Sequence, residues 1–370
     1  MVTSEGAIAP RIPPSTDSVQ RVGVSTIAAR RTPISLRQIW LAGTLVLTLG
    51  ALATAILLAP PESASPSRAL QWLLFVGSSG HVAATAWFYS VPEVRAYALA
   101  RRARYVHVPI ALVVCVGVVA MVLGPRKLEW LLLGFFGWQF FHFQKQNLGL
   151  AALAGVSQGA GSLRPRERSA LVVAGVGGIG GLLVHPELLE LAIDAHVRFL
   201  FPIAAAVAAV GVLLGLHALR ARAAAERPRA FVAVYLVSLL FFLPVFVFDS
   251  PYAAVAGLTL AHGLQYLLLV GLIAAARRQD QPPLVSLAVL FNAALLGGLL
   301  LNATSHLHAA NAPMRALYGA YLGIVMAHFV VDAGLWRLRD DFPRQFLGAT
   351  VPYLVQPPPH LPAASALGAK

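Results

Sequence analysis

The sequence contains few charged residues and almost no cysteine. Asp, Glu, Lys and Arg make up 12% of its 370 residues, whereas 58% are hydrophobic and the mean hydropathy is +0.72. Soluble globular domains carry about 25% charged residues, so the composition excludes that class and indicates a polytopic membrane protein. The single cysteine, Cys115, excludes a disulfide framework and a thiolate metal site.

The chain also lacks a polar segment long enough to form a soluble domain. Residues 1–37 contain no apolar run of the signal-peptide type, and their Ser, Pro and Arg content predicts a disordered, basic cytoplasmic tail. Residues 341–370 are expected to form a Pro-rich cytoplasmic tail. Residues 38–340 are then left as a single transmembrane helical domain, and any chemistry must take place within it.

Apolar runs long enough to cross a hydrocarbon core of about 30 Å recur throughout this domain. We therefore predict an all-α integral membrane protein, a bundle of about ten transmembrane helices. The expected spans are residues 39–59, 69–90, 105–124, 128–154, 170–190, 199–219, 230–248, 252–275, 284–303 and 315–336.

The positive charge of the chain, formally +13, gathers in alternate loops between these spans. Arg101, Arg102 and Arg104 lie in one such loop, and Arg220 and Arg222 begin another. By the positive-inside rule these loops are cytoplasmic, which places the N-terminus and the C-terminus inside the cell. The basic loops are expected to contact anionic lipids of the bilayer rather than nucleic acid. The Ala-, Leu-, Val-, Gly- and Arg-rich composition favours a bacterial plasma (inner) membrane.

One motif matches a nucleotide-binding fingerprint by chance. "GVGGIG" at 175–180 has the dinucleotide-binding spacing, but it lies inside an expected span with no strand before it. Gly177 and Gly181, four residues apart, instead predict close contact with another helix. Four further histidines fall in expected outer loops, where we interpret them as solvated: His185, His196, His306 and His308.

Four histidines lie inside expected spans in the company of other polar residues. His81, His142, His262 and His328 fall on the second, fourth, eighth and tenth spans, all of which would run from outside to inside. Each is about 11–14 residues from the outer edge, or roughly 16–21 Å at about 1.5 Å per residue. This depth is near the middle of the hydrocarbon core. We therefore expect the four histidines to share one buried site and to act as metal ligands.

Each histidine has polar residues about one helical turn away. Ser78 and Thr85 flank His81, and the further candidates for roles in catalysis are Lys145, Gln146, Gln265, Tyr266 and Asp332. Such neighbours can fix the tautomer of a metal-bound imidazole or position a substrate. A lone charge within the bilayer costs at least about 2.5–3.5 kcal/mol, so we expect Lys145 to pair with Asp332 or to contact a substrate.

Imidazoles with a nearby carboxylate suit iron, copper or zinc. The pattern favours a metal-dependent oxidoreductase or oxygenase with non-haem iron, acting on a lipid-soluble substrate such as an isoprenoid, a fatty-acyl lipid or a quinone. Haem b, held by paired histidines and served by a redox partner, and copper are alternatives. A different class also stays open, because midplane His, Lys and Asp residues can form the path of a proton- or ion-coupled transporter.

Overall fold

The computed structural model describes residues 35–61, 65–193, 196–276, 282–309 and 311–357. Within these ranges the regular secondary structure is helical throughout, without a β-strand. Residues 1–34 and 358–370, most of the two predicted tails, lie outside the described residues.

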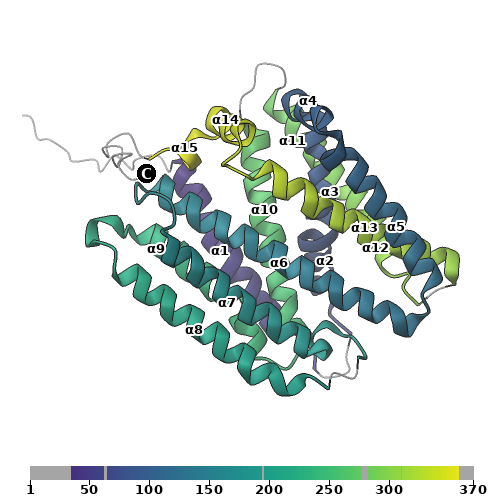
Figure 1. Ribbon diagram of the computed structural model, residues 1–370. Helices are drawn as coiled ribbons and strands as arrows, with labels where there is room; N and C mark the ends of the chain where they lie inside the picture. Colours follow the sequence, from purple (N-terminus) through teal and green to yellow (C-terminus); the bar gives the residue numbers. More distant parts are fainter. Residues whose placement is uncertain (1–34, 62–64, 194–195, 277–281, 310, 358–370) are drawn as a thin grey trace, which may run out of the picture. The chain divides into compact units, whose positions relative to one another are not determined.

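Fifteen α-helices follow one another along the described chain (Figure 1). They are α1 (Leu36–Leu57), α2 (Arg68–Phe75), α3 (His81–Ala84), α4 (Pro92–Ala100), α5 (Val108–Val122), α6 (Pro125–Ser157), α7 (Pro165–Val184), α8 (Phe201–Arg220), α9 (Arg229–Leu239), α10 (Gly257–Ala275), α11 (Pro283–Asn292), α12 (Gly298–Ser305), α13 (Ala312–Leu335), α14 (Asp341–Thr350) and α15 (Pro352–Val355). Short π turns join some of them into longer helical segments: Val76–Gly80, Ala103–His107, Tyr252–Ala256 and Ala293–Gly297.

Seven helical segments of the described chain are long and apolar enough to cross a membrane, as expected for a polytopic membrane protein. They are Leu36–Leu57, Ala103–Val122, Pro165–Val184, Arg198–Arg220, Tyr252–Ala275, Pro283–Ser305 and Ala312–Leu335. The other three expected spans also coincide with helical structure. The π turn Val76–Gly80 interrupts one of them, α6 carries several polar side chains, and α9 has only 11 residues.

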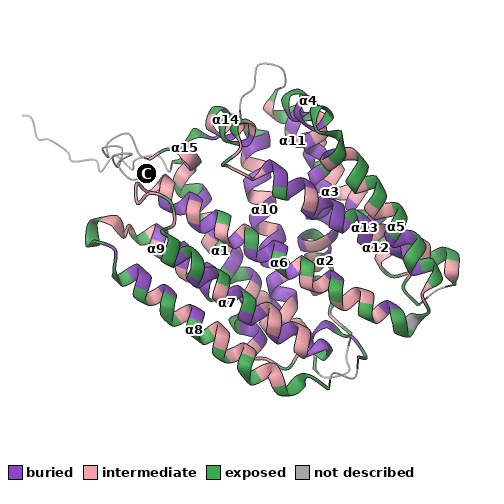
Figure 2. Cartoon of the chain, in the orientation of Figure 1, coloured by how far each residue is buried: buried purple, intermediate pink, exposed green. Residues whose placement is uncertain are grey.

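The helices differ sharply in how far they are enclosed by the others. Of the most apolar stretch of α10, and likewise of α13, 61% of the residues are buried, whereas the corresponding share for α8 is 11%. Figure 2 shows this contrast, with buried positions gathered on the inner helices and exposed positions along α8. The exposed residues of α8 include Val210, Leu213 and Leu214, an apolar surface that suits contact with lipid.

Glycines allow several helix pairs to approach closely. A Cβ atom built on Gly263 of α10 would lie 2.1 Å from the carbonyl oxygen of Gly77, and one built on Gly77 would lie 2.7 Å from the Cα of Leu260. The backbones therefore touch where the π turn crosses α10. The contact expected at Gly177 is also present, because a Cβ there would meet the backbone of Ala208 in α8. Small residues at such crossings are typical of membrane helices.

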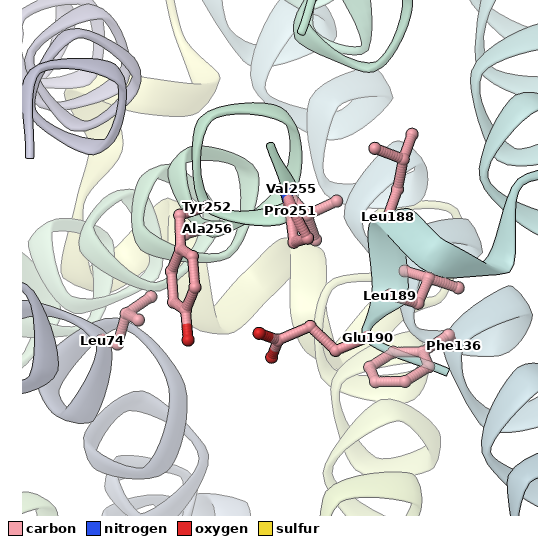
Figure 3. Close-up of a pocket in the computed structure, with 9 residues that line it drawn as sticks. All are labelled: Leu74, Phe136, Leu188, Leu189, Glu190, Pro251, Tyr252, Val255 and Ala256. Carbon is pink, nitrogen blue, oxygen red and sulfur yellow. The ribbon is translucent and has the colours of Figure 1, made fainter. Parts of the chain in front are cut away.

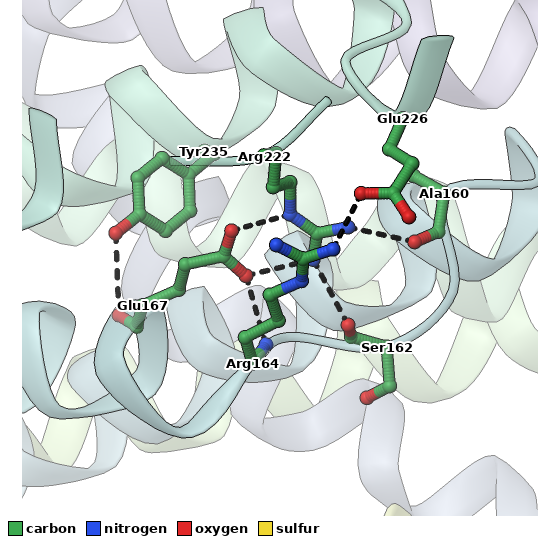
Figure 4. Close-up of polar contacts among 7 residues, drawn as sticks. All are labelled: Ala160, Ser162, Arg164, Glu167, Arg222, Glu226 and Tyr235. Atoms are coloured by element: carbon green, nitrogen blue, oxygen red, sulfur yellow. Dashed lines mark hydrogen bonds and ion pairs between the residues drawn. The ribbon is translucent and has the colours of Figure 1, made fainter. Parts of the chain in front are cut away.

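A buried ion pair ties α7 to the segment that follows α8 (Figure 4). Arg222 and Glu167 are almost completely buried, and the guanidinium donates two hydrogen bonds to the carboxylate. It also donates to the carbonyl oxygens of Ala160 and Ser162, at 2.7 and 3.0 Å. The expectation that Arg222 is merely a loop charge facing lipid headgroups was therefore wrong. Its charge is satisfied inside the protein, because a buried guanidinium needs a paired carboxylate.

The chain after α13 packs back onto the bundle. Leu347, Val351 and Leu354, from the segment of α14 and α15, are buried. The Arg37 side chain at the start of α1 donates a hydrogen bond to the carbonyl oxygen of Tyr353, at 3.1 Å. Residues 341–357, the first part of the expected C-terminal tail, thus form two helices against the membrane domain.

Candidate metal centre

The four histidines of the predicted site come together from four separate helices. His81 begins α3 directly after the π turn Val76–Gly80, and the others lie within α6, α10 and α13. His142 and His81 each lie between His262 and His328, which closes a ring of four imidazoles. Neighbouring ring centroids are 5.0 or 5.1 Å apart around this ring. All four side chains are buried.

These separations match the size of a single metal ion with four imidazole ligands. An imidazole nitrogen binds a metal at about 2.0–2.1 Å, which puts the ion about 3.2 Å from the ring centroid and neighbouring ligand rings about 4.5–5.2 Å apart. Ligand atoms of His81, His262 and His328 lie within 4.8 Å of one another, and the same holds for His142, His328 and Asp332. Both groups share His328, so they are two parts of one cluster.

The Nε2 atoms of the four histidines are buried and have no hydrogen-bond partner among the described residues. A buried polar atom without a partner costs about 1–3 kcal/mol, so four of them in one place form an unfavourable arrangement for structure alone. A metal ion accepts the lone pair of a neutral imidazole nitrogen and would remove this cost. The ring thus has the geometry and the unpartnered nitrogen atoms with which it could hold a metal ion.

A chain of hydrogen bonds fixes the tautomer of His328. The Tyr266 hydroxyl donates to Oδ1 of Asp332 at 3.2 Å, so its oxygen accepts the Thr85 hydroxyl proton at 2.8 Å. Having only one proton, Thr85 must then accept from Nδ1–H of His328, at 2.6 Å. His328 is therefore protonated on Nδ1, and the lone pair of Nε2 points into the cluster. Thr85 was expected to serve His81 on its own helical segment, but it orients a histidine of α13 instead.

Asp332 lies beside the imidazole ring and is 2% exposed. Its Oδ2 atom is 3.6 Å from Nε2 of His328 and 3.9 Å from Nε2 of His142. These distances exceed those of a hydrogen bond, so the oxygen faces both nitrogens without bonding to either. The carboxylate is in position to be a fifth ligand or to accept a proton at the metal.

Two phenylalanines enclose the cluster. The Phe143 ring stacks on His262, with 4.0 Å between centroids and 19° between planes. The Phe329 ring stacks on His142, with 4.6 Å and 27°. These rings restrict the rotation of both imidazoles and exclude water from them. Each phenylalanine directly follows a histidine of the cluster in the sequence. The His-Phe pair was therefore a visible signal, although an aromatic residue in a membrane helix is commonly a lipid contact.

A second polar group lies one helical turn beyond the ring. The Gln146 side-chain amide donates to Oε1 of Gln265 at 2.8 Å and to the carbonyl oxygen of His262 at 3.0 Å. Gln265 in turn donates to the hydroxyl of Thr48 in α1, at 2.6 Å. Both glutamines thus support α10 next to the cluster instead of reaching its centre. Sequence reasoning missed Thr48, because α1 looked bare of polar groups. Its signal was the pair Thr44 and Thr48, one turn apart on the buried face of α1.

Lys145 does not join the site. Its side chain is exposed, and its Nζ atom lies 5.3 Å from the ring centroid of Phe141 on the outer face of α6. The expected pair between Lys145 and Asp332 is wrong among the described contacts, because Asp332 interacts with Tyr266 and the histidines. The physical reason is helical geometry. Lys145 is three residues after His142, which turns it toward Phe141, whereas Gln146 at four residues stays closer to the face of the histidine.

The histidines that were expected in outer loops are not all solvated. His196, His306 and His308 are exposed, as expected. His185 is buried, and its Nε2 atom lies 2.9 Å from the Glu187 carboxylate. It follows the end of α7 and holds the loop that leads to Glu190, so its expected solvation was wrong.

Comparison with known proteins provides no family assignment for this arrangement. No protein family model matches the chain, and no match was found among curated proteins or solved structures.

Proposed function

We propose that this protein is a membrane-embedded, histidine-liganded metalloprotein, and that it works as an oxidoreductase on a lipid-soluble substrate. The observation that carries this proposal is the closed ring of four buried imidazoles whose Nε2 atoms have no hydrogen-bond partner in the part of the chain that the structure describes. In this proposal His81, His142, His262 and His328 hold the metal, with Asp332 beside them.

Non-haem iron is the metal that we favour. Four nitrogen ligands and one carboxylate suit iron, copper or zinc, whereas magnesium and calcium prefer oxygen ligands. Iron or copper would supply the redox chemistry. The ring leaves little room for a haem, because neighbouring imidazoles are in edge contact and Phe143 and Phe329 cover two of them. A macrocycle would need space between its axial ligands that these contacts occupy.

The residues of this chain would each do a definite part of the work. Thr85 and Tyr266 keep the lone pair of His328 directed at the metal, which a metal-bound histidine requires from its surroundings. Asp332 would accept or return a proton at its Oδ2 atom, beside the two nearest Nε2 atoms. The phenylalanines would keep bulk water from the centre, and a lipid-soluble substrate would reach it from the bilayer.

We further propose that the chain crosses a bacterial inner membrane ten times, with both ends in the cytoplasm. The three segments that fall short of the seven candidate spans would cross as well: residues 68–90, α6 and the region from α9 to residue 248. The alternation of basic loops supports this topology. Single cysteines introduced into alternate loops of a Cys115→Ser background, labelled from outside intact cells, would test it. Labelling of the loop at Arg102 from outside would contradict it.

Metal analysis of the detergent-purified protein tests the proposed function. We expect about one equivalent of iron, no Soret band, and loss of the metal in His142→Ala and His262→Ala. As a matched control, His308→Ala removes an exposed histidine and should leave the metal content unchanged. Protein that binds no iron, copper or zinc would overturn the proposal. The cluster would then be better explained by a proton- or ion-coupled transporter.

A further inference from the structure

A cavity of about 180 Å³ lies beside three of the helical segments that lead to the histidines (Figure 3). Its walls are apolar except at one side, where the Tyr252 hydroxyl and the Glu190 carboxylate point toward one another. The apolar wall includes Leu74, Phe136 and Val255. The cavity is thus a pocket for an apolar molecule with a single polar region.

Three helical segments lead from this cavity to the imidazole ring. Leu74 and Val255 each precede a histidine of the cluster by seven residues, His81 and His262. Seven residues advance along a helix by about 10 Å, so each cavity residue lies about that far along its helical segment from its histidine, across all or part of a π turn. Phe136 precedes the histidine of α6 by six residues, or about 9 Å. All three helices therefore run from the cavity toward the ring in the same direction.

A row of aromatic rings connects the two places along α6. Phe136 in the cavity wall is followed by Phe140, with 6.3 Å between ring centroids, and then by Phe143 at 5.3 Å. Phe143 stacks on His262 of the cluster. Phe140 and Phe143 are buried, so packed apolar side chains separate the cavity from the ring. These surroundings suit a hydrocarbon chain better than a polar solute.

Glu190 is held at the cavity in an unusual conformation. Among the described residues it is the only non-glycine residue with positive φ, 55°. Such a backbone costs of order 1–3 kcal/mol and persists where the surroundings enforce it. Here the preceding loop is fixed by Glu187, which interacts with His185 and Arg198, both at 2.9 Å. The carboxylate is exposed, so it presents a hydrogen-bond acceptor at the open side of the cavity.

We propose that this cavity binds the hydroxyl end of a long apolar alcohol, the substrate of the metal centre, with its chain extending toward the imidazole ring. The inference rests on the proposed function. A carboxylate accepts a hydrogen bond from a hydroxyl but repels an anionic headgroup, which disfavours fatty-acid anions and phospholipids. A quinone is disfavoured too, because its reactive ring would stay in the cavity, about 10 Å from the metal. The reacting position would thus lie well inside the chain of the alcohol.

Binding of tritiated hexadecanol to the full-length protein in phosphatidylcholine nanodiscs tests this inference. Two unlabelled competitors are used: hexadecyl sulfate, in which a sulfate replaces the hydroxyl, and hexadecane, which lacks it. On the wild type we expect both to compete at least about tenfold more weakly than unlabelled hexadecanol. Glu190→Gln should weaken hexadecanol binding by about fivefold to tenfold. It should also reduce the difference in affinity between hexadecanol and hexadecyl sulfate, because the repulsive charge is gone.

A cavity-filling variant supplies the steric test. Val255→Trp should reduce hexadecanol binding by at least about tenfold, since the indole would occupy the pocket. Val176→Trp is the matched control, because Val176 lies on α7, away from the cavity, and is 58% exposed. Equal competition by hexadecyl sulfate and hexadecanol, or equal binding by the two tryptophan variants, would overturn the inference. Iron content measured on the same samples separates the two hypotheses. Metal without selective alcohol binding refutes this inference alone, and absence of metal refutes the proposed function.

Discussion

Thr85 offers the sharpest test of how the imidazole ring is organised. Its hydroxyl group accepts from Nδ1–H of His328 at 2.6 Å and bonds to the Tyr266 hydroxyl at 2.8 Å. Thr85→Val keeps the shape of the side chain and removes both bonds. The histidine then has a buried N–H without a partner, which costs about 1–3 kcal/mol. It is also free to adopt the other tautomer, which turns its Nε2 from an acceptor into a donor.

The expected consequence is a loss of metal affinity. Mutation of groups that orient a metal ligand typically costs about 10- to 100-fold, or about 1.4–2.7 kcal/mol. Affinity can be measured by competition with a chelator on protein in detergent. Thr85→Ser keeps the hydroxyl and should bind within about threefold of the wild type, while Tyr266→Phe should lie between the two, because Thr85 then keeps its bond to the histidine.

A matched control removes the same group elsewhere. Thr304→Val deletes a hydroxyl that donates to backbone carbonyls of its own helix, α12, and it should leave metal affinity unchanged. If Thr85→Val binds the metal as tightly as this control does, the tautomer argument fails, and Thr85 is merely a packing residue between α13 and its own helical segment.

Three further predictions concern the surrounding structure. Gly263→Val should prevent assembly of the bundle, since even a Cβ would lie 2.1 Å from a carbonyl oxygen. A Cβ on Gly271 would meet no neighbouring atom within 4 Å, so Gly271→Val should elute normally in fluorescence-detected size-exclusion chromatography. Glu167→Gln leaves a buried guanidinium without a counter-charge and should cost about 3–5 kcal/mol. The same change at the exposed Glu226 should cost at most about 1 kcal/mol, and equal losses in thermal stability would disprove the distinction. Lys145→Met should change the metal dissociation constant and the unfolding equilibrium constant by no more than about twofold, because the side chain is exposed. A loss of bound metal in this variant would show that Lys145 belongs to the site.

Much of the candidate site could be identified from single residues. Placing a polar group in hydrocarbon costs free energy, so four histidines stood out in apolar runs: His81, His142, His262 and His328. Their equal depth on spans that all run from outside to inside predicted that they meet. Asp332 was conspicuous for the same reason. The structure brings these five together.

Other parts could not be found this way, because they depend on which helices are neighbours. Sequence separation showed that Thr85 is one turn from His81, but only the packing of the second helical segment against α13 made it the partner of His328. Likewise, Thr48 and Gln265 are 217 residues apart and bond only because α1 lies against α10.

The sequence by itself determined that this chain is a helical membrane protein. It also showed which histidines lie in apolar runs, where their burial has to be compensated. Both conclusions follow from the free energy of transferring side chains into lipid. The tertiary structure decided the rest. It directed Lys145 away from Asp332, buried Arg222 and His185, and placed a cavity beside helical segments that lead to the imidazole ring. These outcomes depend on the rotation of each helix about its axis and on the neighbour it meets. Apolar side chains on every face leave that rotation unspecified, and close packing at residues such as Gly77 and Gly263 fixes it.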